Sequence, residues 1–239
     1  MRLSRLGKRS RDDHSSPDPR TTVVQSVPGS RQGHNPTGSD DEDPNLMFLS
    51  PGWLTALRAS LQPTGEPNPR EARRTAAVLL PLYRQEEAWW LLFTRRAESV
   101  EHHRGQVSFP GGMAEASDPD LATTALREAE EEIGLRPDEV ELIGQMPPRL
   151  TTTGFWVTPI VGRVRWPTAL RLNEHEVARV FGIPLTWLAV PDNHSRRQLE
   201  LPDRAETVEV VTFKPYDGEV VWGATARIVL DFLDRLPSA

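Results

Sequence analysis

The chain has 239 residues, contains no cysteine and carries a formal net charge of −6 at pH 7. The lack of cysteine excludes disulfides and thiolate metal sites, and the acidic balance argues against a protein that coats nucleic acid. No apolar run approaches the ~18 residues that cross a bilayer, and the N-terminus lacks the apolar core of a secretory signal. We therefore expect a cytoplasmic protein with no membrane and no nucleic-acid partner.

Residues 1–46 are expected to form a disordered tail. They are rich in Ser, Pro, Gly, Arg and Asp, contain few large apolar residues, and end in the acidic run 39–43. Such a segment cannot bury enough apolar surface to offset the entropy of ordering it. Residues 47–239 remain, and a chain of that length can build one domain around a core of its own.

The apolar pattern of the first half predicts a short helix followed by paired strands. The helix is expected over 53–61, before the turn-rich residues 62–69. Residues 84–87 are polar and separate two apolar runs, which indicates a hairpin. The expected strands cover residues 76–83, 88–94, 107–109, 140–144 and 156–164. Strands mixed with few helices predict an α/β fold with a mixed β-sheet covered on both faces.

The C-terminal part is predicted to hold two helices and a pair of strands. Residues 174–181 are expected to be helical, and residues 224–236 have the amphipathic pattern of a C-terminal helix. Residues 207–212 and 219–222 are expected to pair as strands around the Asp-Gly turn at 217–218.

A central helix is predicted from Pro119 to Ile133. Asp118 is the expected N-cap, Pro119 the first helical residue and Gly134 the left-handed C-cap. An apolar stripe can anchor this helix to a core; it consists of Ala122, Ala125, Leu126, Ala129 and Ile133.

Three carboxylates, Glu128, Glu131 and Glu132, fall within one 100° sector of this helix. So much negative charge on one rigid patch is unfavourable unless a cation binds there. Hard divalent ions such as Mg²⁺ take oxygen ligands and commonly bridge to substrate phosphates. The pattern therefore predicts metal-assisted chemistry on a phosphorylated substrate. The alternative is a solvated acidic helix face paired with Arg127.

Residues 127–135, Arg-Glu-Ala-Glu-Glu-Glu-Ile-Gly-Leu, resemble the end of the Nudix signature. Upstream, Gly112 and Asp118 are similar to its glycine and first acidic residue, and Glu115 competes for the acidic role. The gap between Asp118 and Arg127 is one residue longer than in the standard signature. Members of this family hydrolyse nucleoside diphosphates linked to another group. The resemblance implies their fold, an α/β/α sandwich with a mixed β-sheet.

A second resemblance points to the Nudix coenzyme A pyrophosphatases, which share the longer spacing. It is carried by residues 91–94, 105–112, 124–129, 173–177 and 221–226. The chain departs from that branch at Ala97, Glu101 and Met113, where the branch usually has Ser, Arg and often Lys. If that Arg contacts a substrate phosphate, Glu101 would repel it, so substrates other than coenzyme A stay open.

The resemblance implies roles for the residues of the signature. Glu128, Glu131, Glu132 and the carbonyl of Gly112 are the expected ligands of Mg²⁺ or Mn²⁺. Glu128 and Glu131 are also expected to act in catalysis, with Glu128 orienting or deprotonating the attacking water, and Arg127 is expected to hold Glu131 in place. A further acidic ligand from a distant loop is expected at Glu174 or Glu176, and the alternative is that either residue caps the following helix.

The expected substrate-binding residues precede the helix. Arg95, Arg96 and Arg104 lie in a positive cluster with two histidines, and arginine forks suit phosphate geometry. A solvated loop is the alternative. Gly111 permits the backbone to approach a phosphate closely. Trp156 and Trp222 are candidates to stack on adenine, although a tryptophan is more often buried in the core.

The leading interpretation is a pyrophosphohydrolase that cleaves coenzyme A or its thioesters to 4′-phosphopantetheine, or its acyl form, and adenosine 3′,5′-bisphosphate. The enzyme alternative is a Nudix hydrolase of a dinucleotide cofactor, ADP-ribose or a damaged nucleoside triphosphate. A third possibility is a regulatory domain that binds a nucleotide without hydrolysing it, although such domains typically lose part of the carboxylate set. The partner is thus a small nucleotide, and a homodimer is compatible with each interpretation.

Overall fold

The computed structural model describes residues 23–24, 52–65, 74–98, 105–200 and 207–236. A central sheet of eight strands has the order β10-β3-β2-β8-β6, with β4 beside β3, β5 beside β2 and β7 beside β8. Its strands are β2 (Thr75–Gln85), β3 (Ala88–Arg96), β4 (Val107–Ser108), β5 (Gly111–Met113), β6 (Val140–Gln145), β7 (Arg149–Leu150), β8 (Trp156–Val164) and β10 (Val177–Pro184). Only β2 and β8 run parallel, so the sheet is mixed, as predicted.

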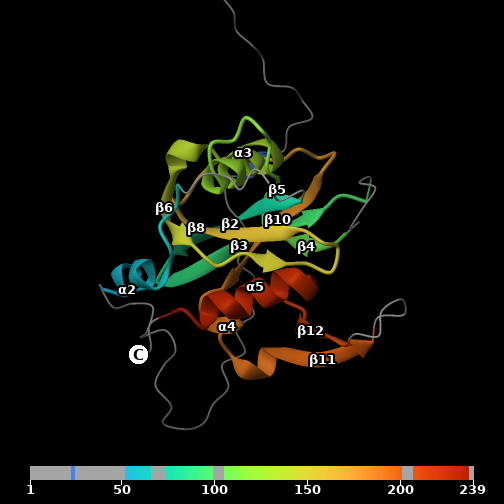
Figure 1. The fold of residues 1–239 in the computed structure, drawn as a ribbon. Coiled ribbons are helices and arrows are strands. Elements are labelled where there is room, and N and C mark those ends of the chain that lie inside the picture. The colour runs from blue at the N-terminus through green and yellow to red at the C-terminus, as the bar shows by residue number, and fades with distance from the viewer. Residues whose placement is uncertain (1–22, 25–51, 66–73, 99–104, 201–206, 237–239) are drawn as a thin grey trace, which may run out of the picture.

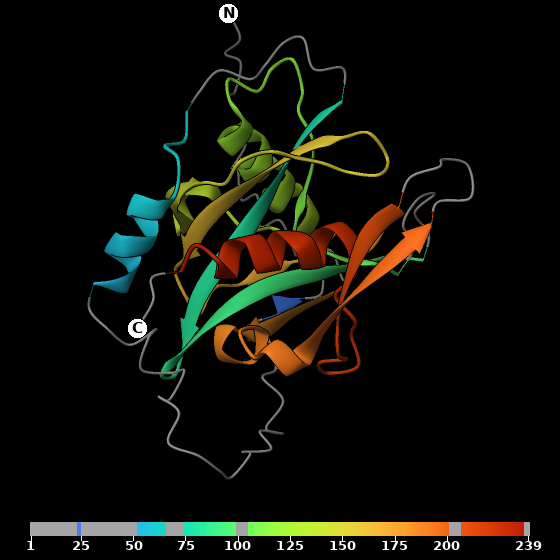
Figure 2. The ribbon, with the colours of Figure 1, turned by 60° about the horizontal axis from the view of Figure 1, so that its bottom comes forward.

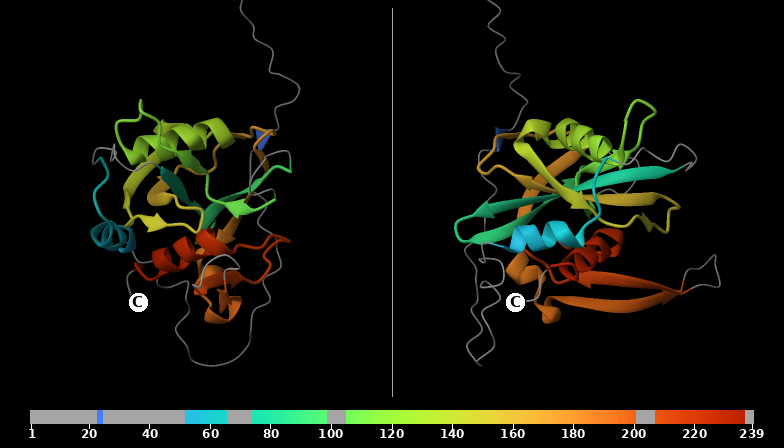
Figure 3. Two further views of the ribbon diagram at one scale, coloured as in Figure 1. Left: turned by 45° about the vertical axis from the view of Figure 1, so that its right-hand side comes forward. Right: turned by 60° about the vertical axis from the view of Figure 1, so that its left-hand side comes forward.

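Helices cover both faces of the sheet (Figure 1). Figure 3 shows the layers in order: α3 (Leu121–Ile133), the sheet, then α5 (Gly223–Leu233), with the hairpin of β11 (His194–Glu200) and β12 (Thr207–Phe213) beyond α5. Two shorter helices, α2 (Trp53–Ser60) and α4 (Leu185–Leu188), complete the layers, and Figure 2 shows α2 at the edge of the sheet. The predicted α/β sandwich is confirmed.

The predicted hairpin is present, with β2 and β3 joined by a turn at residues 86–87. Both strands form the centre of the core, because most of their side chains are buried between α3 and α5. β3 also pairs with β4, which precedes the two glycines of β5. The rings of Phe93 in β3 and Phe109 after β4 stack with their centroids 4.8 Å apart. The stacking fixes the segment that leads to the two glycines.

The central helix begins later than predicted. Its N-cap is Asp120, whose side chain accepts a hydrogen bond from the Thr123 N–H. Asp118 is not the cap because its buried carboxylate is bound by Arg127 instead. The predicted C-cap is confirmed, since Gly134 has a left-handed φ of 67°.

One prediction for the C-terminal part is wrong, and another is right only in part. Residues 174–181 do not form a helix; β10 occupies Val177–Pro184 and pairs antiparallel with β3. Residues 207–212 do form a strand, but its partner is β11, and residues 219–222 contribute only the bridges Thr212↔Trp222 and Tyr216↔Glu219. The predicted C-terminal helix is confirmed as α5.

Two residues of the predicted tail are part of the described structure. They form β1 (Val23–Val24), which pairs with β9 (Leu170–Arg171). The rest of residues 1–46 lies outside the described residues. Two 3-10 turns complete the described elements, η1 (Pro137–Glu139) and η2 (Pro191–Asn193). Among the described residues, no helix is long and apolar enough to span a bilayer.

Candidate active site

The carboxylates of α3 lie against the two glycines of β5. Glu132 is buried and its Oε2 accepts a hydrogen bond of 3.3 Å from the Gly111 N–H. Glu128 lies over Gly112 so closely that a Cβ on that glycine would be 2.5 Å from the carboxylate carbon. Glu131 is more open, with 57% of its side chain exposed. The predicted proximity of Gly112 to these glutamates is therefore present.

The Arg127 side chain forms hydrogen bonds with four groups beside these carboxylates. Its guanidinium donates hydrogen bonds to Asp118, to Glu128 at 3.0 Å, to Glu131 at 3.1 Å and to the carbonyl of Met113 at 3.1 Å. The contact between Arg127 and Glu131 is the one expected from their spacing. Because one side chain binds two of the three glutamates, Arg127 fixes their positions relative to the start of the helix.

Asp118 serves as the anchor for Arg127 rather than as a helix cap. Burial opposes its ionisation, but hydrogen bonds from Arg127, the Glu115 N–H and Thr124 outweigh burial and lower its pKa below the ordinary value. Asp118 is therefore ionised near neutral pH and forms a charge-assisted pair with Arg127. Glu115, the competing candidate, contributes its backbone and lies 3.9 Å from Arg127.

Two of the glutamates are held in conditions that disfavour their charge. Burial raises the pKa of Glu132 to about 8, although Arg96 and the Gly111 N–H oppose this. Burial also raises the pKa of Glu128, against the charge of Arg127. The charge of Glu176 raises the pKa of both glutamates, so it faces the same site. Glu176 is thus well placed to be the additional acidic ligand expected from a distant loop.

The donor set suits a hard divalent cation. Within the ranges that the structure describes, no three His, Cys, Asp or Glu side chains already form a ligand cluster. The present contacts explain this, because Arg127 binds Glu128 and Glu131 while Arg96 lies 3.7 Å from Glu132. Carboxylates that repel one another are favoured together by a cation. Their all-oxygen chemistry fits Mg²⁺ or Mn²⁺.

The predicted arginine cluster does not form one patch. Successive side chains of a strand point to opposite faces of its sheet. Arg96 lies beside Glu132 on the α3 side, whereas Arg95 lies 3.7 Å from Glu219, which also binds Arg179. Arg104, the third member, lies outside the described residues.

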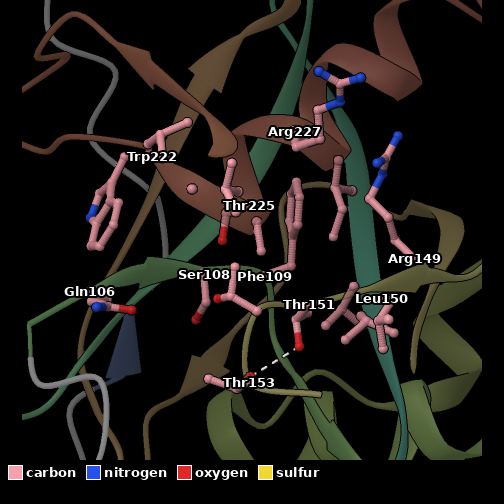
Figure 4. Close-up of a pocket in the computed structure, with 18 of the residues that line it drawn as sticks. Gln106, Ser108, Phe109, Arg149, Leu150, Thr151, Thr153, Trp222, Thr225 and Arg227 are labelled. Carbon is pink, nitrogen blue, oxygen red and sulfur yellow. Dashed lines mark hydrogen bonds between the residues drawn. The ribbon is translucent and has the colours of Figure 1, made fainter. Parts of the chain in front are cut away.

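A pocket of about 600 Å³ lies on the α5 side of the sheet (Figure 4). Its walls come from β4 and the residue after it, β7 with the following loop, the hairpin β11–β12 and the first half of α5. Ser108 and Phe109 line it, and Gly111 and Gly112, a few residues on, contact the glutamates. Trp222, 44% exposed, is one of the lining side chains. One segment of chain therefore connects the pocket to the carboxylates.

Sequence reasoning found one side of this arrangement. The Phe-Pro-Gly-Gly segment and Trp222 were recognised, and Trp156, the other candidate, does not line the pocket. Arg149, Leu150 and the hairpin residue Leu199 were missed. These residues carry no local signal, because they become neighbours only when β7, β11 and α5 pack together.

The comparisons with known proteins agree with this geometry. The NUDIX domain model matches residues 72–224. The "Uncharacterized Nudix hydrolase NudL" of Pectobacterium atrosepticum is 36% identical over 186 residues, which cover 78% of this chain and 94% of that protein. Its namesake from Citrobacter koseri is 41% identical over 158 residues, covering 66% and 80%.

Among solved structures, a MutT/nudix family protein from Enterococcus faecalis has a TM-score of 0.45 and 16% identity, and the match covers 84% of this chain and 75% of that one. The match to the NUDIX domain model extends over the sheet, α3 and the segment of the two glycines. The chain therefore belongs to the Nudix hydrolase family.

Proposed function

We propose that this protein hydrolyses the diphosphate of coenzyme A or its thioesters, releasing 4′-phosphopantetheine, or its acyl form, and adenosine 3′,5′-bisphosphate. The observation that carries the proposal is the continuity of residues 108–112, which line a pocket at one end and contact Glu128 and Glu132 at the other. A nucleoside diphosphate derivative has the same two parts, a bulky nucleoside and a diphosphate.

The nucleoside portion is expected to enter the pocket on the α5 side. The exposed ring of Trp222 and the apolar side chains of Leu150 and Leu199 offer it contact surface. Pockets of this size with mostly apolar walls bind small ligands well, and flat rings stack on aromatic side chains. The diphosphate would then lie over Gly111 and Gly112, where the absence of Cβ atoms permits close approach.

Glu128, Glu131, Glu132 and the Gly112 carbonyl would hold Mg²⁺ or Mn²⁺, with Glu176 as a further ligand. When bound, such an ion supplies positive charge at the phosphoryl oxygens and acidifies water. Arg127 keeps Glu128 and Glu131 in position through its hydrogen bonds.

Glu128 is the proposed general base. It accepts a proton from a water whose oxygen attacks one phosphorus in line, and the bond from that phosphorus to the bridging oxygen breaks. The leaving phosphate keeps the electron pair of that bond, so no covalent enzyme intermediate is needed.

The choice of coenzyme A is supported by the resemblance of residues 91–94, 105–112 and 124–129 to that branch of the family. The departure at Glu101 favours the second candidate, a Nudix hydrolase of a dinucleotide cofactor, ADP-ribose or a damaged nucleoside triphosphate. A binding domain without activity is disfavoured, since all three glutamates and Arg127 are kept.

The test is product analysis with the full chain. Coenzyme A, acetyl-coenzyme A, NADH, ADP-ribose and 8-oxo-dGTP are incubated separately with Mg²⁺ or Mn²⁺, and the products are separated by chromatography. We expect adenosine 3′,5′-bisphosphate from the first two compounds, with the highest kcat/KM among the five. Preferred turnover of any other compound would contradict the coenzyme A assignment while leaving the hydrolase assignment intact.

A further inference from the structure

A group of charged side chains forms one side of the pocket, away from the glutamates of α3. Arg149 and Arg227 both line the pocket, and Figure 4 shows them along one side of it, with Trp222 on the opposite side. Both guanidinium groups are paired with the same carboxylate, Asp231 of α5. The shared partner holds two arginines from distant parts of the chain next to each other.

These arginines keep unused capacity to bind an anion. Arg227 also pairs with Glu209, and its buried Nε lies 3.6 Å from Asp231, so the exposed part of the guanidinium is what a ligand can reach. The side chains of Arg149 and Arg227 are 39% and 34% exposed, so solvent and a ligand can reach them. Each arginine has five N–H donors, and the two carboxylates Asp231 and Glu209 cannot accept hydrogen bonds from all ten.

The local charge also favours an anion. Arg196 lies 3.6 Å from Glu209, and Arg235 donates to the backbone carbonyl of Asp231. Three guanidinium groups thus pair with the two carboxylates and a fourth binds the backbone carbonyl of Asp231, so among these six groups positive charge exceeds negative charge by two. A phosphate monoester carries about −1.5 to −2 charges at pH 7, which matches this excess.

Several hydroxyl groups of the pocket wall already take part in hydrogen bonds within the protein. Thr225 donates to the Val107 carbonyl at 3.1 Å, Thr151 and Thr153 share a hydrogen bond of 2.9 Å, and Ser108 shares one of 3.1 Å with Thr94. These hydroxyl groups are already engaged within the protein. Arg149 and Arg227 are therefore the cationic side chains among the residues that line the pocket, and Glu209, which pairs with Arg227, is the anionic one.

We propose that Arg149 and Arg227 form a subsite for a phosphate monoester on the nucleoside portion of the substrate. The proposal rests on the proposed function and makes it more specific. A substrate with a diphosphate and a separate phosphate on its ribose is selected over one that has the diphosphate alone. Coenzyme A has such a 3′-phosphate, whereas ADP-ribose and NADH do not.

The experiment compares coenzyme A with 3′-dephospho-coenzyme A, which differ only in this phosphate. The unaltered protein is expected to hydrolyse coenzyme A with a kcat/KM at least about tenfold higher, the value of one charge-assisted hydrogen-bonded group. Arg149→Gln and Arg227→Gln should lower kcat/KM for coenzyme A by on the order of tenfold each and leave the dephospho compound nearly unchanged. Arg149→Lys keeps the positive charge but loses the forked guanidinium, so its kcat/KM for coenzyme A should lie between those of the unaltered protein and Arg149→Gln.

The control is Arg163→Gln. Arg163 also pairs with a glutamate, Glu141, and is 47% exposed, but it does not line the pocket. It should change neither kcat/KM value. Thermal unfolding of every variant tests whether the fold is kept. If Arg149→Gln and Arg227→Gln lower kcat/KM for both compounds equally, the arginines only fasten the 149–153 loop to α5 and the proposal is wrong.

Other outcomes separate this proposal from the proposed function. Equal turnover of the two compounds by the unaltered protein would overturn the subsite and leave the coenzyme A assignment standing. If neither compound is hydrolysed, the coenzyme A assignment is wrong, and the subsite is then tested by binding. Calorimetry in EDTA compares adenosine 3′,5′-bisphosphate with AMP. The bisphosphate should bind at least about tenfold more tightly, and only when both arginines are present; equal affinities would refute the subsite.

Discussion

The two neighbouring glycines of β5 are expected to respond in opposite ways to alanine. At Gly111 a Cβ would lie 2.3 Å from the carbonyl oxygen of Ala77 and 2.6 Å from the Cα of Val78, which are backbone atoms of β2. Gly111 also has a φ of 155°, which L side chains rarely adopt. At Gly112 the three nearest atoms, 2.5 to 2.6 Å away, all belong to the carboxylate of Glu128.

The kind of atom that each new Cβ would meet determines how much stability each variant loses. Gly111→Ala must move backbone, so it combines strain of about 1–3 kcal/mol with overpacking of about 1–3 kcal/mol. Gly112→Ala only has to move the end of a flexible side chain. It should cost about 1 kcal/mol of unfolding free energy, the worth of the 3.0 Å hydrogen bond between Arg127 and Glu128. A displacement of Glu128 by ~1 Å should nevertheless lower kcat/KM by about 100-fold.

Urea unfolding and steady-state kinetics with coenzyme A measure the two effects separately. Gly52→Ala serves as the control, because no atom lies within 4 Å of its Cβ position and its φ is −96°. We expect Gly111→Ala to lose stability and Gly112→Ala to lose activity. The reasoning is refuted if Gly112→Ala keeps kcat/KM near the original value, or if both variants lose equal unfolding free energy.

Three further predictions test the charges of the site. In EDTA, the free energy of unfolding should fall as pH rises from about 5 to 8, by ~1.4 kcal/mol per unit of pKa shift. The reason is that Glu132, with a pKa of about 8, keeps its proton in the folded state while the unfolded chain loses it near 4.5. Glu132→Gln should remove most of this slope and leave a smaller part from Glu128, whose pKa burial also raises; an unchanged slope in urea titrations would contradict the role of Glu132. Arg127→Gln should cost about 2–4 kcal/mol, because Asp118 is left buried without its cation. Adding Asp118→Asn should restore part of that loss, and no recovery would contradict the pairing. Glu176→Gln should weaken Mn²⁺ binding about tenfold by titration, while Glu174→Gln should not; equal effects would remove Glu176 from the ligand set.

The central helix was predictable because its signals are local. The spacing of Glu128, Glu131 and Glu132, the partner Arg127 and the glycine at 134 are all set by the geometry of one helix. The first residue of the helix was not predictable, because Asp118 and Asp120 are both residue types that cap helices. The structure decides between them through Arg127, whose guanidinium engages Asp118 and leaves Asp120 to cap the helix.

Predictions failed where distant parts of the chain meet. Val177, Val180 and Phe181 have the spacing of a helical face, but pairing with the edge of β3 makes them a strand. Backbone hydrogen bonds to a neighbouring strand outweigh a local helical pattern. Arg95 and Arg96 were assigned to one cluster because they are adjacent in sequence, yet the alternation of a strand separates them.

The segment from Ser108 to Gly112 explains why both sides of the site are needed together. It pairs with β3 at one end and with β2 at the other, so its position is fixed by the centre of the sheet. The distance between the pocket and the glutamates is therefore set by two short strands, each paired with the central sheet, and by the two residues between them. Under the proposed function, a nucleotide whose nucleoside fills the pocket must extend along residues 108–112 to bring its diphosphate to Glu128. Selection among nucleotides would then depend on the other walls of the pocket, which are β7 with the loop that follows it, the hairpin β11–β12 and the first half of α5.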